Sequence, residues 1–444
     1  MLLTIDKLIY GGEGLARLPA DEHGRGKAVF VPFVLAGEKI EASLTEQKPG
    51  FSRARAERVI EPSPHRIPPA CPYFGQCGGC HYQHATYEHQ LEIKTQILRE
   101  TLRRTARLEL QIEILVHPSP PWNYRNRARL QLLTHPEFAA GYFKLASHEL
   151  QPVEQCPISS PLINRGIAGL WQSGRDAKVP AGVQEIEFFA NADDSQLLLE
   201  LSCTADCHRA AVRAWGEEFR AAMPEVVGVV AFRRATPGAP NSQEKLVSVG
   251  TPRLTYQTQR KAYRVSAGSF FQTNRHLTDE LVKIVTGGRS GDVALDLYAG
   301  VGLFSTVLAC DFHHIVSVES SQTSSADLSY NLLSNGVAVQ ASTEQYLARM
   351  ENPGRVGTGV VLPHILHKPD LTVVDPPRTG LGERVARQLA SLGTPRLTYV
   401  SCDPATLARD LVPLLAAGYQ IEQMHLVDLF PQTFHIESIV HLRR

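Results

Sequence analysis

The sequence predicts an α/β protein in three parts: a small N-terminal β-barrel, a central mixed α/β region and a C-terminal doubly wound sheet. A chain of 444 residues suffices for about three domains of roughly 150 residues each. Short apolar runs punctuated by glycine fill the first part, whereas strand-like and helix-like segments alternate in the last third. We expect the parts to cover residues 1–62, 63–265 and 266–444.

The composition is that of a folded protein, with 43% hydrophobic and 20% charged residues. Lys plus Arg and Asp plus Glu both number 45, which argues against a wholly basic nucleic-acid coat protein but leaves local patches open. The apolar run at 226–232 is too short to cross a bilayer, and the N-terminal residues do not resemble a signal peptide. We therefore expect a cytoplasmic protein without a membrane segment, and a monomer by default.

The N-terminal part reads as closely spaced short strands, which suggests a compact barrel. A linker should follow at 61–72, where five prolines remove backbone donors. A helix is expected over 87–107, with one apolar face and one charged face. Between Lys94 and Arg129 there are eight Lys or Arg residues against three Glu. Taken alone, this basic segment could be a solvated helix face.

The last third has the pattern of a mostly parallel sheet covered by helices. The expected strands are Val293–Tyr298, Ile315–Glu319, Leu371–Val374, Leu397–Val400, Ile421–Leu429 and Ile436–Leu442.

A ligand site is expected after the first of these strands. Gly300 and Gly302 follow the strand and precede an apolar helix, and Glu319 ends the next strand, where it could accept from two ribose hydroxyls. Ser305 stands where a dinucleotide-binding fingerprint has its third glycine. This departure favours S-adenosylmethionine over NAD.

Three further residues follow or begin strands of the same sheet. Asp375 begins an Asp-Pro-Pro-Arg segment, Cys402 precedes a helix whose N-terminus should stabilise a thiolate, and Glu437 begins a late strand. Carbon 5 of uracil attacks a methyl donor only after a thiolate has added to carbon 6, and a base must then remove the carbon 5 proton. Cys402 and Glu437 are the candidate nucleophile and base, and Asp375 is expected to hold the uracil edge or the cofactor.

A second group of candidate functional residues, all cysteines, lies near the linker. Cys71, Cys77 and Cys80 lie close together in the sequence, and Cys156 is a fourth candidate. In a reducing compartment such a group of cysteines indicates a metal-binding site. Four thiolates fit either zinc or an iron–sulfur cluster, and a closed set of four favours a structural role.

Taken together, these motifs resemble the uridine-5 RNA methyltransferase family, in particular its iron–sulfur members that act on 23S ribosomal RNA. The resemblance rests on residues 12–38, the four cysteines, the segment Gly268 to Asn274, and the segments around Asp375, Cys402 and Glu437. It implies an N-terminal TRAM domain, which is an OB-like RNA-binding barrel, and a C-terminal Rossmann-like methyltransferase domain.

The resemblance also assigns roles to residues. It implies catalysis by Cys402 and Glu437, binding of S-adenosylmethionine by Gln272, Tyr298, Glu319 and Asp375, and a [4Fe-4S] cluster on Cys71, Cys77, Cys80 and Cys156. The central part would carry this cluster. The TRAM barrel and the basic segment would clamp the RNA, with ribosomal RNA favoured and transfer RNA possible.

Two other hypotheses compete with this enzyme. One is an RNA-binding or ribosome-assembly protein whose methyltransferase fold is unused, and loss of Cys402 or Glu437 would have favoured it. The other is a redox enzyme built on the cluster, which lacks any sequence signal for a flavin or NAD site.

Overall fold

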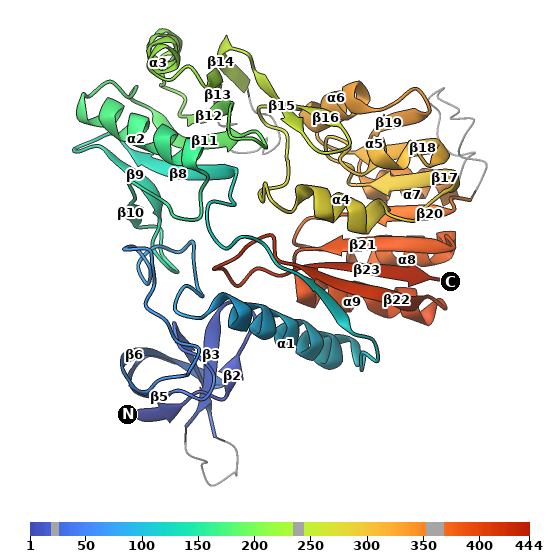
Figure 1. Ribbon diagram of the computed structural model, residues 1–444, viewed down its shortest axis with the longest axis horizontal. Coiled ribbons are helices and arrows are strands. Elements are labelled where there is room, and N and C mark those ends of the chain that lie inside the picture. Colours follow the sequence, from blue (N-terminus) through green and yellow to red (C-terminus); the bar gives the residue numbers. More distant parts are fainter. Residues whose placement is uncertain (19–25, 234–243, 352–367) are drawn as a thin grey trace.

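The computed structural model describes residues 1–18, 26–233, 244–351 and 368–444. Three parts follow one another along the chain: in Figure 1 the N-terminal part lies at the lower left, the central part above it and the C-terminal part at the right. None of the helices in these ranges is long and apolar enough to cross a membrane.

The N-terminal part, here called the barrel (residues 1–61), is one six-stranded sheet in the order β1-β5-β6-β4-β3-β2. Alternate residues of β4 and β5 are buried, as expected for strands with one face on a core. The bounds are β1 Leu2–Thr4, β2 Lys7–Leu8, β3 Glu13–Arg17, β4 Ala28–Pro32, β5 Lys39–Gln47 and β6 Phe51–Glu61. The predicted barrel is confirmed, with β2 and β3 as strands that the apolar runs did not reveal.

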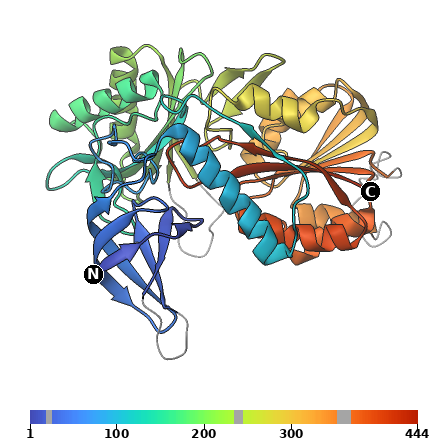
Figure 2. The same cartoon turned by 60° about the horizontal axis from the view of Figure 1, so that its bottom comes forward.

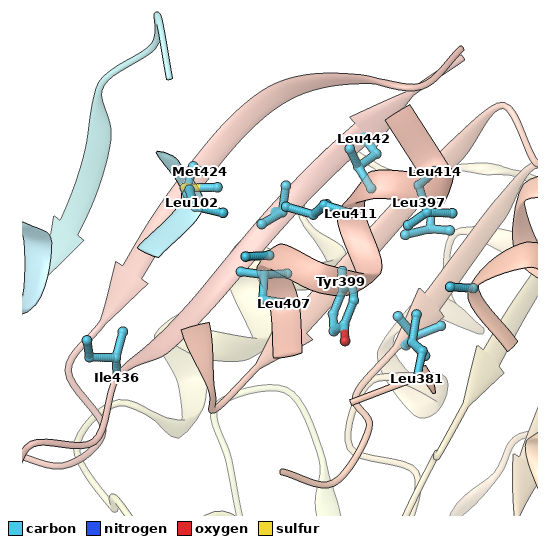
Figure 3. Close-up of a cluster of buried hydrophobic side chains, with 14 of the residues drawn as sticks. Leu102, Leu381, Leu397, Tyr399, Leu407, Leu411, Leu414, Met424, Ile436 and Leu442 are labelled. Carbon is cyan, nitrogen blue, oxygen red and sulfur yellow. The ribbon is translucent and has the colours of Figure 1, made fainter. Parts of the chain in front are cut away.

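The next segment joins the C-terminal sheet rather than the central part. Helix α1 (Tyr87–Ala106) packs on α9 (Pro404–Ala416), and β7 (Ile114–His117) pairs in parallel with β22 (Gln420–Val427). Figure 3 shows Leu102 of α1 beside Met424 of β22 in the shared core. The helix was predicted correctly. The expected boundaries assign it to the central part at 63–265, whereas it packs on a helix of the C-terminal part.

The central part is a seven-stranded sheet in the order β10-β9-β8-β11-β12-β13-β14, with helices α2 and α3 packed on it. A buried apolar cluster that includes Phe188, Leu199 and Trp215 lies between sheet and helices. The bounds are β8 Arg127–Leu133, β9 Ala139–Phe143, β10 Leu150–Pro152, α2 Pro161–Arg175, β11 Val183–Ala190, β12 Leu197–Cys203, α3 Arg209–Ala222, β13 Val226–Arg233 and β14 Glu244–Gly250. The hairpin of β15 (Arg253–Gln257) and β16 (Ala262–Ser266) leads into the last part.

The C-terminal part is an eight-stranded sheet in the order β19-β18-β17-β20-β21-β23-β22-β7. Strands β17 to β21 are parallel, whereas β23 runs antiparallel between β21 and β22. The remaining bounds are α4 Thr278–Thr286, β17 Gly291–Leu297, α5 Ser305–Leu308, β18 Phe312–Glu319, α6 Gln322–Asn331, β19 Gly336–Gln340, α7 Thr343–Glu351, β20 Leu371–Val374, α8 Gly382–Leu392, β21 Arg396–Ser401 and β23 Glu437–Arg443. The predicted mostly parallel sheet is confirmed.

Helices cover both faces of this sheet (Figures 1 and 2). One face packs against α1, α7, α8 and α9, and the other packs against α4 and α5. Because both faces are covered, strands such as β20, with the sequence Leu-Thr-Val-Val, are buried along their whole length. The carboxyl ends of the parallel strands remain the open edge, and the candidate site lies there.

Candidate active site

The site residues converge because of the order of the strands. Three site residues directly follow neighbouring strands of the sheet: Tyr298 follows β17, Asp375 follows β20 and Cys402 follows β21. Parallel strands place their carboxyl ends at one edge, where open α/β sheets bind ligands. The sequence therefore brings residues from more than a hundred positions apart to one edge.

Three predicted cofactor residues share one small cavity. Gln272, Tyr298 and Asp375 line a space of about 30 Å³ together with aromatic residues of the segments 270–271 and 304. Glu319 reaches the same turn, because the Gly300 backbone N–H donates to its Oε2 at 2.9 Å. Tyr298 and Gly300 both have positive φ, at 62° and 56°, so the turn after β17 is a tight one.

A buried carboxyl supports that turn from within the strand. Asp296 is fully buried in β17, accepts a hydrogen bond from the Ser305 hydroxyl, and has a pKa that burial raises to about 7. Its Oδ1 has no hydrogen-bond partner among the described residues. Asp296 thus adds a carboxyl beneath the cavity, close enough to Asp375 to raise the pKa of that residue.

Cys402 and Glu437 lie opposite each other at the end of an antiparallel pair. The register pairs Ser401 of β21 with Ser438 of β23, so the next residues in each direction are Cys402 and Glu437. The Ser438 hydroxyl also donates to the Ser401 carbonyl oxygen at 3.3 Å. The predicted nucleophile and base are thereby brought together by strand pairing.

The surroundings of Cys402 favour the thiol over the expected thiolate. Burial raises the pKa of the Cys402 thiol to about 12, and the nearby Glu437 and Asp375 carboxylates act in the same direction. At the N-terminus of α9, the Asp403 side chain accepts from the backbone N–H groups of Ala405 and Thr406, both at 2.9 Å.

The two carboxyls beside it also favour the protonated form. Glu437 is only 6% exposed, and burial first, then the Asp375 carboxylate, raise its pKa well above the usual range. Burial and Asp296 raise the pKa of Asp375 to about 7. The Arg378 guanidinium opposes the upward shifts of Cys402 and Glu437, because its positive charge lowers the pKa of each. A carboxyl with a raised pKa is a stronger base once ionised.

The four predicted metal-ligating cysteines meet at a separate cavity. Cys71, Cys77, Cys80 and Cys156 all line one space of about 180 Å³, which Arg125 also lines. Burial raises the pKa of Cys77 to about 11 and also raises the pKa values of Cys71 and Cys80. In the described ranges, no three His, Cys, Asp or Glu side chains are placed to hold a metal ion. The thiols surround a space without converging on one point.

Part of the basic segment is used for contacts within the protein. Lys94 is fully buried in an ion pair with Asp428 at 2.6 Å, and Arg127 and Arg129 both pair with Glu187. The side chain of Arg99 donates to the carbonyl oxygen of Ile112. Several of these charges thus make contacts within the protein, whereas the side chains of Arg104 and Arg129 are still 61% and 53% exposed.

A groove beside the barrel is the larger concave surface near the site. Its volume is about 950 Å³, and its lining comes from the barrel, the loop that holds the cysteines, and the segment before Glu437. Arg53, Arg55 and Arg58 of β6 line it, and each forms an ion pair with a glutamate. Phe434 lies at its inner end, three residues from Glu437.

Sequence reasoning missed two features of the site. Tyr10 of the barrel reaches the Cys402 turn, and the Lys94–Asp428 pair fixes the loop that leads to Glu437. Neither has a local signal, since each joins segments more than 300 residues apart.

The fold and the site define a Rossmann-like methyltransferase, with a glycine turn after the first strand and an acidic residue after the second. A family model described as tRNA (Uracil-5-)-methyltransferase matches residues 86–444, and a TRAM domain model matches residues 1–56. The chain belongs to the tRNA (uracil-5-)-methyltransferase family. It is an S-adenosylmethionine-dependent RNA (uracil-C5) methyltransferase with an N-terminal TRAM domain.

Relatives and a solved structure agree with this membership. A protein of Aquifex aeolicus named as an RNA methyltransferase is 32% identical over 448 residues, covering 99% of this chain and 97% of the relative. A relative from Streptomyces avermitilis, also named as an RNA methyltransferase, is 32% identical over 470 residues and covers 99% of this chain and 97% of its own. The fold matches Pyrococcus abyssi tRNA (uracil-54, C5)-methyltransferase, solved with S-adenosyl-L-homocysteine, with a TM-score of 0.73, 21% identity and full coverage of both chains.

Proposed function

We propose that the protein methylates carbon 5 of a uridine in RNA, with Cys402 as the nucleophile and Glu437 as the base. The observation that carries this proposal is the register of β21 and β23, which sets Cys402 opposite Glu437 beside the cavity that Gln272 and Tyr298 line. A nucleophile, a base and a cofactor pocket at one sheet edge are the parts that this reaction needs.

The reaction balances with these groups. The Cys402 thiol gives up its proton to solvent and its sulfur forms a bond to carbon 6 of uracil. Carbon 5 then takes the methyl group of S-adenosylmethionine, which leaves as S-adenosylhomocysteine. Glu437, ionised at this stage, accepts the carbon 5 proton, the double bond between carbons 5 and 6 re-forms, and the thiolate leaves. The raised pKa of Glu437 suits a base that must take a proton from carbon.

The same proposal assigns the cofactor residues. Gln272, Tyr298 and Asp375 would line the binding site of S-adenosylmethionine, and Glu319 would accept from its ribose hydroxyls. The cavity is too small for the whole cofactor as it stands, so we expect the Phe270 side chain, which is 61% exposed, to move on binding.

The variant Cys402→Ala tests the nucleophile. It should abolish methylation, because no other group can activate carbon 5, while binding of S-adenosylmethionine and RNA remains. Methyl transfer would be followed with labelled cofactor and binding by titration. Cys310→Ala is the matched control, since this exposed cysteine lies away from the sheet edge. Turnover retained in Cys402→Ala would remove Cys402 from the mechanism.

We propose ribosomal RNA as the substrate class, as the sequence resemblance implies, and transfer RNA as the second candidate. The second is favoured by the structural neighbour, which is a transfer RNA enzyme. Both RNAs from a strain that lacks the gene would be incubated with labelled cofactor and digested. Labelled 5-methyluridine at one large-subunit position supports the first candidate, and label confined to transfer RNA supports the second.

We propose that Cys71, Cys77, Cys80 and Cys156 hold a [4Fe-4S] cluster. Their thiols surround a cavity of about 180 Å³ instead of converging on one point, which suits a polynuclear cluster better than a single zinc ion. When bound, the cluster would link the cysteine loop to the segment around Cys156, which is a structural role. None of the methylation steps involves it.

Iron content tests this assignment. Protein purified without oxygen should contain about four irons per chain, and Cys156→Ser should lose most of them because one thiolate ligand is gone. Cys203→Ser is the matched control, since that buried cysteine lies in the central sheet. Stoichiometric zinc in the wild-type protein would contradict the cluster.

A further inference from the structure

The barrel makes direct contact with the turn that carries Cys402. Tyr10 lies between β2 and β3, in a turn that continues through Gly11 and Gly12, both with positive φ. Its ring meets Phe434 edge to face, with centroids 5.5 Å apart and planes at 89°. Phe434 also packs against His81 of the cysteine loop, at a centroid distance of 4.7 Å. Three distant segments thus meet beside the sheet edge.

The Tyr10 hydroxyl is directed at the backbone of the Cys402 turn. It donates to the carbonyl oxygen of Cys402 at 3.4 Å, and the Asp403 carboxylate is also within hydrogen-bonding reach. Burial and Asp403 raise the pKa of Tyr10 above its usual value, so the hydroxyl remains a donor under all working conditions. The donor comes from a residue that lies 392 positions away in the chain.

Hydrogen bonds hold the turn on its strand side and on its helix side, and Tyr10 adds a contact from the barrel. Asp403 has an extended backbone and caps α9, so the chain direction changes at Cys402 itself. On the strand side, the Ser401 hydroxyl accepts from the Asp403 backbone N–H at 3.3 Å. The Cys402 carbonyl oxygen accepts its hydrogen bond from the Tyr10 hydroxyl. A fixed orientation of this peptide group limits how far the backbone of Cys402, and with it the thiol, can move.

We propose that Tyr10 is a positioning residue, through which the N-terminal barrel holds the Cys402 turn so that the thiol stays opposite Glu437. This inference rests on the proposed role of Cys402. It means that the barrel completes the catalytic centre in addition to contacting RNA. The same turn lines the groove beside the barrel through Gly11 and Gly12, so the RNA-facing surface and the support of the nucleophile share one short segment.

The variant Tyr10→Phe tests the proposal, because it removes the hydroxyl and keeps the ring against Phe434. The adduct between Cys402 and RNA can be trapped with 5-fluorouridine, since the base cannot remove fluorine as it removes a proton. We expect the rate of adduct formation and kcat to fall roughly three- to tenfold, as for loss of one hydrogen bond, with KM for RNA unchanged. Hydrogen exchange at the amides of Cys402, Asp403 and Ala405 should become faster.

Tyr419→Phe is the matched control. The Tyr419 hydroxyl also donates to a buried carbonyl oxygen, that of Thr394, at 2.8 Å and away from the site. It should alter neither the adduct rate nor exchange near Cys402. Unchanged kcat, adduct rate and exchange in Tyr10→Phe would overturn the proposal, and so would a rise in KM alone, which would make Tyr10 an RNA contact. If the wild-type protein methylates no RNA, the proposed function fails, and the exchange comparison still decides the role of Tyr10.

Discussion

At the scale of single residues, the site combines a neutral thiol with carboxyls that resist ionisation. Burial raises the pKa of Cys402 to about 12 and of Asp375 to about 7, and Glu437 shifts in the same direction. The sequence could identify Cys402 and Glu437, because each stands at a strand end in a recognisable segment. It could not predict their protonation, since that depends on burial and on charges from β20 and β23.

The raised pKa of Glu437 has a consequence for stability. Glu437 keeps its proton to a higher pH in the folded protein than in the unfolded chain. The stabilisation that this proton provides is therefore complete below the unfolded pKa of about 4.3 and is lost as the pH rises through the folded pKa. Glu437→Gln should therefore raise the free energy of unfolding at pH 8 and leave it unchanged near pH 4. Denaturant unfolding at both pH values measures this.

Glu217→Gln provides the control for that prediction, because Glu217 is exposed on α3. It should change stability little at either pH. A Glu437→Gln protein that is less stable than wild type at pH 8 would show that the carboxylate makes favourable contacts that outweigh its burial.

At the scale of elements, one ion pair joins α1 to the loop that leads to Glu437. Lys94 and Asp428 are both fully buried, and Lys94 also donates to the Phe430 carbonyl oxygen at 3.0 Å. The Tyr87 hydroxyl donates to the other Asp428 oxygen at 3.0 Å. The sequence predicted α1 from its periodicity, but it placed Lys94 in an RNA-binding surface, because composition cannot tell a buried charge from an exposed one.

Lys94→Met should destabilise the protein by about 3–5 kcal/mol, because it leaves the Asp428 carboxylate buried without its partner. Thermal or denaturant unfolding measures the change. Lys7→Met is matched to it, since Lys7 pairs with Glu100 of the same helix at the surface, and that loss should be under about 1 kcal/mol. Adding Asp428→Asn to Lys94→Met should recover part of the stability. Equal losses in the two single variants would contradict the role given to the buried pair.

At the scale of the whole molecule, the three expected parts are present, but their boundaries follow long-range pairing. Four of the parallel strands of the last third were located to within a few residues, because strands buried on both faces appear as apolar runs. The edge strand β19, which is only half-buried, was missed. The addition of β7 to the edge of that sheet could not be predicted, since its partner residues in β22 lie 310 positions later. The contact of Tyr10 with the Cys402 turn escaped prediction for the same reason.

The central claim is that Cys402 bonds to carbon 6 and Glu437 removes the carbon 5 proton. The most direct test is the mass of intact Glu437→Gln protein after incubation with S-adenosylmethionine and substrate RNA, followed by peptide mapping. The account predicts a persistent adduct of protein and methylated RNA, joined at Cys402, because the proton cannot leave. Normal turnover by Glu437→Gln without an adduct, or an adduct at another residue, would contradict it.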